Sequence, residues 1–222
     1  MSGLVRRLVA EGLGSVLLAA TGVGSGAMAE RLAAGNVAVA LLANTAATVA
    51  VLAALIALLG PTSGAHFNPV VSVVEAVRRR LAWHHALAYA LVQVLGCCAG
   101  AVLAHLMFGL PAIQVATHVR TGLPQWLSEV VATLGLVLVV LGHRRNEDAP
   151  WMVAAWIGAA YWFTASTSFA NPAITVARSL TNTFSGIRVV DVPGFVLAQF
   201  AGAALALAIA SILWPGRSQR TG

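Results

Sequence analysis

The tripeptides Asn68-Pro69-Val70 and Asn171-Pro172-Ala173 decide the fold of this chain. Proline fits the first turn of a helix, where its missing N–H is not needed, and asparagine before it is a strong N-cap. Both tripeptides therefore predict the start of a helix. The apolar stretch after each one is roughly ten residues long, so it reaches about 15 Å, half of a hydrocarbon core of about 30 Å. Two helices that cross only half of a membrane indicate a pore.

The composition places the whole chain in a membrane. Of 222 residues, 9% are charged and 59% are hydrophobic, whereas a soluble domain has roughly 25% and 45–50%. The first apolar run has a basic start like a signal peptide, but it is long and contains Glu11, so we expect it to stay as a helix. We predict an all-α membrane protein with two re-entrant half-helices and six transmembrane helices, at about residues 4–28, 37–59, 87–109, 123–142, 150–163 and 192–214.

The basic residues, all of them arginine, predict an orientation. If six helices alternate, nine arginines fall on one side and four on the other. By the positive-inside rule both termini face the cytoplasm. The net charge of +6 then reflects the orientation of the chain in the membrane. Nucleic acid is not an expected partner, because the arginines cap helices and form no extended basic face. The arginine-only, alanine-rich composition favours a bacterial inner membrane.

The two halves of the chain carry the same polar residues in the same order. Glu11 in the first helix matches Glu129 in the fourth, and Gln93 in the third matches Gln199 in the sixth, each glutamine being followed three residues later by glycine. Each half has three spans, so the second copy enters the membrane from the opposite side, as an inverted repeat. We expect one channel domain over residues 1–222, with repeats at about 1–110 and 120–222.

The motifs resemble those of a known family. Residues 63–70, SGAHFNPV, and residues 168–173, SFANPA, are similar to the two signature loops of the aquaporin, or major intrinsic protein, family of water and small-solute channels. Val70 replaces the usual alanine of the first motif. The resemblance implies homotetramers with one pore in each subunit, in contact with membrane lipid. It also implies passive conduction, with no enzymatic chemistry and no cofactor.

The two half-helix starts predict the chemistry of the pore. Each carries unsatisfied N–H groups and about half a positive charge, so together they repel cations. Asn68 and Asn171 would each cap a helix through the side-chain oxygen and offer amide N–H groups to a passing solute. The alternative is that both asparagines are caps and nothing more.

The other polar residues of the loops have two interpretations each. Glu11 and Glu129 are acids inside predicted spans, so they are candidates for proton relays in a coupled transporter. The resemblance implies instead that each accepts backbone N–H groups of the nearby re-entrant loop and supports its shape. His66 either lines the pore or packs against the loop. Cys97 and Cys98 point in different directions on a helix, so we expect no disulfide and no metal site.

The predicted selectivity filter departs from the family. Most members carry an arginine three residues after the second asparagine, beside an aromatic residue and often a histidine. Here that position is Ile174, and the alignment puts Thr48, Ser168 and Ala159 at the other three, with Ala160 as the neighbouring choice for the last. A filter of small and aliphatic residues is wider and less polar, which argues against water-only selectivity.

Arg178 complicates this expectation. It lies four residues beyond Ile174, on the same helical face, and helical side chains lean toward the N-terminus. Its guanidinium would then reach into the outer mouth about one pitch, or 5 Å, further out. The alternative is that Arg178 extends to the interface and pairs with loop carbonyls or Asp191. Asn44 is a further candidate for the lumen.

We therefore expect a passive channel for water and for small uncharged solutes. The expected solutes are glycerol-like polyols, urea and neutral metalloid hydroxides such as arsenous acid. Thr175 stands where glycerol-selective members usually carry aspartate, so a dedicated glycerol facilitator is not predicted. The alternatives are a water-selective channel in which Arg178 replaces the missing arginine, and a coupled transporter. A transporter needs an unbalanced charge or ion site at the midplane, and the sequence shows none.

Overall fold

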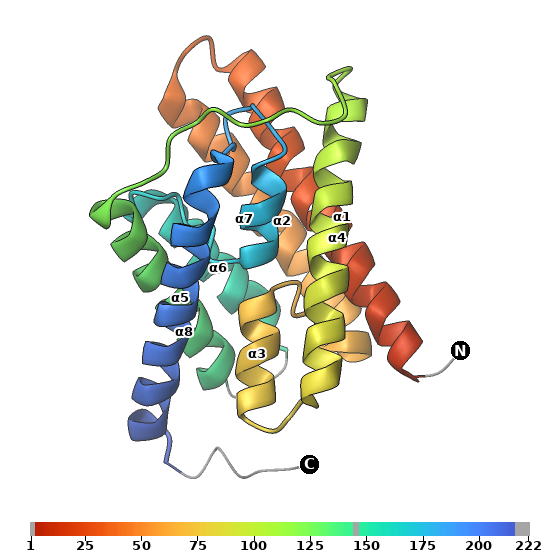
Figure 1. The fold of residues 1–222 in the computed structure, drawn as a ribbon, viewed down its shortest axis with the longest axis vertical. Helices are drawn as coiled ribbons and strands as arrows, with labels where there is room; N and C mark the ends of the chain where they lie inside the picture. Colours follow the sequence, from red (N-terminus) through yellow and green to blue (C-terminus); the bar gives the residue numbers. More distant parts are fainter. Residues whose placement is uncertain (1–2, 144–146, 216–222) are drawn as a thin grey trace.

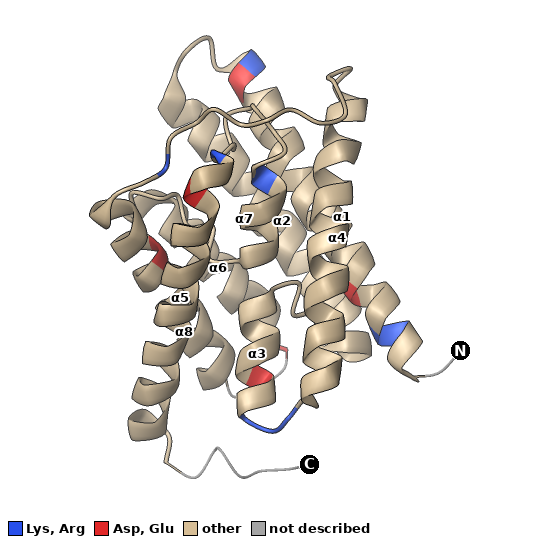
Figure 2. Cartoon of the chain, in the orientation of Figure 1, with Lys and Arg blue, Asp and Glu red and all other residues tan. Residues whose placement is uncertain are grey.

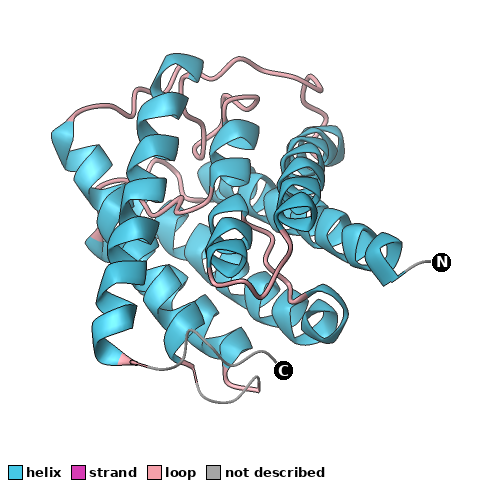
Figure 3. Cartoon of the chain, turned by 60° about the horizontal axis from the view of Figure 1, so that its bottom comes forward, coloured by secondary structure: helices cyan, strands magenta, loops and turns pink. Residues whose placement is uncertain are grey.

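The computed structural model describes residues 3–143 and 147–215 and, within them, every regular element is a helix (Figures 1 and 3). In chain order these are α1 (Gly3–Leu32), α2 (Val37–Ser63), α3 (Pro69–Val77), α4 (Trp83–Met107), α5 (Leu123–Gly142), α6 (Ala149–Phe163), α7 (Pro172–Arg178), the 3-10 turn η1 (Val189–Asp191) and α8 (Val192–Leu213).

Five of the described helices, α1, α2, α4, α5 and α8, are long and apolar enough to cross a membrane. The helix α6 has 15 residues, which reach about 22 Å, so it is the short member of the six predicted spans. Its bounds agree with the expected 150–163 to within one residue. The two predicted half-helices are α3, with nine residues, and α7, with seven.

The surface of the bundle is suited to lipid. Leu87, Leu91 and Leu95 recur along one face of α4 and are each at least 60% exposed. Charged positions lie mainly near the two ends of the bundle, and the middle carries few (Figure 2). This is the pattern that a hydrocarbon core requires, because an exposed charge there is costly.

The repeated glycines explain how the long helices pair. The helix α1 packs closely on α4, and its counterpart α5 packs on α8. A side chain at Gly96 would place its Cβ 2.7 Å from the carbonyl oxygen of Gly12, and one at Gly202 would collide with the carbonyl of Val130. The glycine of each Gln-x-x-Gly segment therefore permits a close helix crossing.

The half-helices α3 and α7 lie in line between these pairs, with their starts toward each other (Figure 1). Asn68 is the N-cap of α3 and Asn171 the N-cap of α7, and proline occupies the first turn of each. The asparagine-proline signal thus marks both helix starts, and the two N-termini meet in the middle of the bundle.

Candidate functional site

Asn68 and Asn171 each make two kinds of hydrogen bond. Asn68 Oδ1 accepts from Val70 N at 3.0 Å, and Asn171 Oδ1 accepts from Ala173 N at 2.9 Å. In addition, Asn68 Nδ2 donates to the carbonyl of Ala170, and Asn171 Nδ2 to that of Phe67, both at 2.8 Å. The asparagines therefore cap their own helices and link the two loops, and each amide keeps a second N–H.

The loops that carry the asparagines hold an unusual backbone. Ala65 and Phe67 in the first loop have positive φ angles of 49° and 46°, and Ser168 and Ala170 in the second have 49° and 46°. Such angles are unfavourable for residues other than glycine and persist only where the surroundings impose them. The same strain at matching positions indicates that both loops need specific support.

Glu11 supplies this support to the first loop. Its carboxylate is completely buried and accepts four hydrogen bonds: from Ser63 Oγ at 2.6 Å, His66 N at 3.0 Å, Phe67 N at 2.7 Å and Gln93 Nε2 at 2.8 Å. Two of the donors are backbone groups of the strained segment. These four donors thus stabilise the buried negative charge of Glu11.

Glu129 makes the same four bonds to the second loop. It accepts from Ser166 Oγ at 2.6 Å, Phe169 N at 2.9 Å, Ala170 N at 2.8 Å and Gln199 Nε2 at 2.6 Å. Each glutamine also donates to a hydroxyl of its half-helix: Gln93 Nε2 lies 3.1 Å from Ser72 Oγ, and Gln199 Nε2 lies 2.9 Å from Thr175 Oγ1.

The two glutamates therefore have the geometry of loop support. Neither Glu11 nor Glu129 is among the residues that line the central cavity. A proton relay needs a carboxylate that contacts the transported species. The two glutamates therefore do not support the transporter interpretation.

The central cavity has a volume of about 320 Å³ and is lined by both asparagines. One wall consists of the loop residues 64–68 and 168–171 and is polar, because it presents backbone groups and asparagine amides. The opposite wall, from α2, α5 and α6, is aliphatic: Leu52, Ile56, Leu136, Val140, Val153 and Ile157. The cavity thus has one polar side and one mainly aliphatic side, on which Thr48 and Tyr161 are the exceptions among these helices.

Three of the four residues predicted for the filter line this cavity: Thr48, Ser168 and Ile174. Within the described residues, Thr48 Oγ1 and Ser168 Oγ have no hydrogen-bond partner. An unsatisfied buried hydroxyl costs free energy unless water or solute reaches it. Both oxygen atoms are themselves buried in the wall, so rotation of each side chain is needed before its hydroxyl can bond to the contents of the cavity.

Ala159 is not part of the filter, so this prediction is wrong. Ala159 is exposed on the outer face of α6, and Ala160 is buried in the packing between helices. The face of α6 that lines the cavity carries Val153, Ile157 and Tyr161, at helical spacing. The error is one of register, because the alignment from Asn171 back to α6 counts through the irregular residues 164–170, where residues do not advance at a helical rate.

Two aromatic residues of the outer cavity were missed by the sequence analysis. Tyr161 and Phe169 both line the cavity. A signal for Phe169 was present, because it lies two residues before Asn171 as His66 lies two residues before Asn68. Tyr161 follows Ile157 by one helical turn, but only the observed register places either of them on the cavity.

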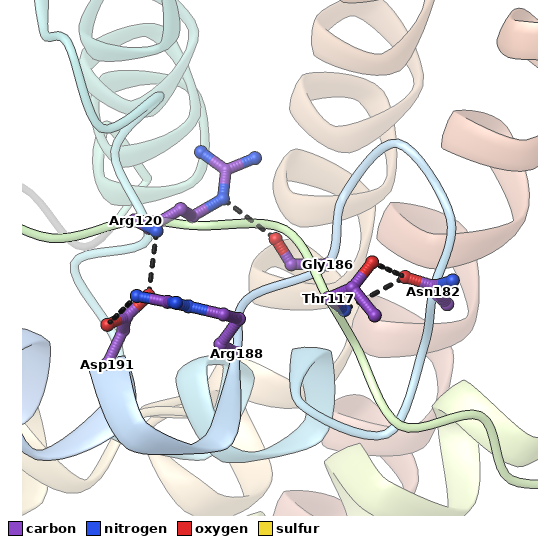
Figure 4. A network of polar contacts seen from close by, with 6 residues as sticks. All are labelled: Thr117, Arg120, Asn182, Gly186, Arg188 and Asp191. Atoms are coloured by element: carbon purple, nitrogen blue, oxygen red, sulfur yellow. Dashed lines mark hydrogen bonds and ion pairs between the residues drawn. The ribbon is translucent and has the colours of Figure 1, made fainter.

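Arg178 lies at the outer end of the same cavity, which is the end next to the loop between α4 and α5. Its side chain is 4% exposed, and its guanidinium carbon lies 4.1 Å from the centre of the Phe169 ring. The alternative partner Asp191 is already engaged, because its carboxylate accepts two bonds of 3.0 Å from Arg188 and one of 2.8 Å from Arg120 N (Figure 4). The geometry therefore agrees with the pore-lining interpretation of Arg178.

The loop between α4 and α5 is pinned over this outer end (Figure 4). Arg120 Nε donates to the carbonyl of Gly186 at 2.8 Å, and Asn182 Oδ1 accepts from Thr117 N and Oγ1 at 2.9 Å. The pKa of Arg120 is lowered to about 10, first by burial and second by the nearby charge of Arg178. Two guanidinium groups thus share the outer end, and only Arg178 lines the cavity.

The remaining candidates divide between the cavity and the packing. His66 does both: it lines the cavity, its Nδ1 lies 3.1 Å from Ser72 Oγ, and its ring stacks edge-on against Tyr89. Asn44 is tied to α1 by a 2.8 Å bond from Nδ2 to the carbonyl of Gly22 and does not line the cavity. Val70 is fully buried against α5 and α8, behind Asn68.

Comparisons with known proteins agree with this architecture. The chain matches the family model described as Major intrinsic protein over residues 1–168. It is 56% identical over 217 residues to aquaglyceroporin AqpS of Rhizobium meliloti (strain 1021), covering 96% of this chain and 93% of that protein. It is 30% identical over 171 residues to aquaporin AqpM of Methanothermobacter marburgensis, covering 68% and 70% of the two chains.

The fold also has a match among solved structures. The X-ray structure of the aquaglyceroporin from Plasmodium falciparum superimposes with a TM-score of 0.71 over 96% of this chain and 98% of that chain, at 19% sequence identity. The likeness confirms the predicted fold of transmembrane helices and two re-entrant half-helices.

Proposed function

Because the chain belongs to the major intrinsic protein family of membrane channels, we propose that it conducts small uncharged hydroxylated solutes together with water. Glycerol-like polyols, urea and neutral metalloid hydroxides such as arsenous acid are the solutes that suit its cavity. The relative at 56% identity is named an aquaglyceroporin, which supports this substrate class. The protein is a multi-pass membrane channel and not an enzyme.

The observation that carries the proposal is the composition of the cavity wall at the expected constriction. Ile174 stands where a pore arginine is usual, and Thr48 and Ser168 stand beside it. The aliphatic side chain of Ile174 leaves room for the carbon chain of a solute, while the asparagine amides donate hydrogen bonds to its oxygens. A polyol needs both surfaces at once, because one edge is apolar and the other carries hydroxyl groups.

The two helix starts account for the exclusion of charge. The N-termini of α3 and α7 meet at the asparagines, so the partial positive charges of both ends face the same short stretch of the cavity. A cation, protonated water included, is repelled there, and a neutral solute is not.

A second candidate, a water-selective channel, is favoured by the outer end of the cavity. Arg178 lies over the ring of Phe169, and Tyr161 lines the same cavity. An arginine beside an aromatic ring makes a narrower and more polar filter. In this version Arg178 takes the place of the missing arginine, about one helical pitch of 5 Å further out.

The assembly and orientation of the channel are also proposals. We infer a homotetramer embedded in membrane lipid, with one pore in each subunit, and an inner-membrane location with both termini in the cytoplasm. The repeats fall at about residues 1–110 and 120–222 of one channel domain. The arginine distribution supports the orientation.

Stopped-flow light scattering on proteoliposomes tests the function, with water, glycerol and arsenous acid measured separately. For native protein we expect rapid entry of all three, and for Ile174→Arg a loss of solute entry with water flow retained. Ile174→Leu is the matched control, because it conserves volume and adds no charge. Fast water flow without solute entry in the native protein would contradict the solute channel and favour the water-selective alternative.

A further inference from the structure

We propose that Glu75 is a second recognition site, at the inner end of the cavity, which binds the hydrogen-bond donors of solutes and retains small organic cations. The solute part of this proposal rests on the proposed function. The cation part does not, because it concerns a charge on the wall of the cavity whatever the channel conducts.

The starting point is the correspondence between the two re-entrant segments. When Asn68 is laid on Asn171, Ser63 falls on Ser166 and Ser72 falls on Thr175, and these pairs make the same hydrogen bonds. Both segments thus carry a hydroxyl residue at each of these two positions.

In the last turn of the two half-helices, the matching residues carry opposite charges. Glu75 falls on Arg178, since each is seven residues after its asparagine. Both side chains line the same cavity. Seven residues of helix span about 10 Å, so the cavity has a carboxylate at about the same depth on one side of the asparagines as it has a guanidinium on the other.

The carboxylate of Glu75 has unused acceptor capacity. Its side chain is 14% exposed, and its one ion pair among the described residues is with Arg80 Nη1 at 3.9 Å, too long for a hydrogen bond. Glu11 and Glu129 each accept four hydrogen bonds from protein groups. An ionised carboxylate has about four acceptor positions, so the remaining positions on Glu75 are open to donors that enter this end of the cavity.

The surroundings of Glu75 decide which contents fit. His66 and Arg80 line the cavity beside it. A neutral solute with hydroxyl or amide N–H groups can donate to Glu75 and then move on past the asparagines. A planar organic cation such as guanidinium can donate two hydrogen bonds to the carboxylate, but the facing helix starts stop it from moving further. Such a cation would block the channel from this end alone.

Sided block of water flow is the experiment. Proteoliposomes or membrane vesicles of each orientation are sorted by a C-terminal tag, and guanidinium chloride is compared with sodium chloride at equal ionic strength and osmolality. The variants are Glu75→Gln, which removes the charge at constant shape, and Glu75→Asp, which keeps it. Glu147→Gln is the matched control, because Glu147 is exposed in the loop before α6 and does not line the cavity.

We expect guanidinium to block native water flow from the face on which α3 ends and not from the opposite face. Glu75→Gln should weaken the block at least tenfold and lower glycerol entry several-fold, and Glu75→Asp and Glu147→Gln should keep the block. The proposal is overturned by equal block in Glu75→Gln and native protein, by block from both faces, by an equal effect of Glu147→Gln, or by loss of water flow in Glu75→Gln, which would make Glu75 a structural residue. If native protein admits no glycerol, the solute channel fails, and the block still tests Glu75.

Discussion

The two re-entrant segments, residues 63–78 and 166–179, share one support and differ where they face the cavity. Each has a glutamate that accepts four hydrogen bonds, a glutamine that bridges to a hydroxyl, and an asparagine that caps its helix. The cavity-facing positions, in contrast, pair His66 with Phe169 and Glu75 with Arg178. Duplicated residues thus build the loops, and the unlike residues make the two ends of the pore chemically different.

The largest expected effect comes from removing the support in either half. Glu11→Ala and Glu129→Ala each leave four donors without an acceptor, and an unsatisfied buried donor costs about 1–3 kcal/mol. We expect both variants to lose several kcal/mol of stability and all solute flux. Thermal unfolding followed by fluorescence-detected size exclusion measures the first, and stopped-flow scattering the second.

Glu30→Ala is the control for these variants, because Glu30 accepts one exposed bond from Phe184 N and should be nearly neutral. If Glu11→Ala were tolerated while Glu129→Ala was not, the two loops would not be held in the same way.

A smaller effect tests a place where the halves differ in packing. An added Cβ at Gly14 would overlap the ring of Phe67, whereas the second half has Ala132 and Ala170 at these positions. Overpacking a core costs about 1–3 kcal/mol, so Gly14→Ala should lower the unfolding temperature. The double variant Gly14→Ala, Phe67→Ala makes the first half like the second, and we expect it to recover part of the loss. Losses that simply added would show that the two positions do not interact.

Selectivity at the outer end should change without loss of stability. Arg178→Gln removes the guanidinium from Phe169 and from the cavity wall. We expect solute entry to rise or stay level and the exclusion of small cations to weaken several-fold, as measured by conductance or cation-driven swelling. Arg188→Gln removes a charge on the same face that does not line the cavity. An equal change in both variants would assign the effect to surface charge.

The smallest effect concerns the outer loop. Asn182→Ala removes the acceptor for Thr117 N and Oγ1, both partly solvated, so we expect a loss of about 1 kcal/mol or less. Hydrogen exchange in residues 110–122 should become faster, while water flow changes little. Unchanged exchange would mean that other bonds of the loop, such as the one from Gln114 N to Leu180 O, hold it without Asn182.

The sequence predicted the parts of the site that depend on local chemistry. Asparagine before proline identifies a capped helix start without reference to the rest of the fold. The matches of Glu11 with Glu129 and of Gln93 with Gln199 indicated the repeat. Ile174 was placed on the cavity by counting along the helix that begins at Asn171, and Thr48 by extending the alignment back from Asn68.

The rest could not be read from sequence for geometric reasons. Ala159 was misplaced because the count crossed an irregular segment, and Tyr161 was missed through the same error. Arg178 had two possible directions, and the choice depended on Asp191, which Arg188 and Arg120 engage. Such competition between distant segments is a property of the fold and not of any one motif.

The most direct measurement of the central claim, that one cavity between the half-helices is the conduction path, is sided labelling of cysteines at matching depths. Val71→Cys and Ile174→Cys line the cavity on either side of the asparagines, and Ala159→Cys lies on the outer face. In a background with Cys97 and Cys98 replaced by alanine, a charged thiol reagent should stop water flow through Val71→Cys only from the face where α3 ends, and through Ile174→Cys only from the other. Unchanged flow after labelling of both, or flow stopped by labelling Ala159→Cys, would contradict the account.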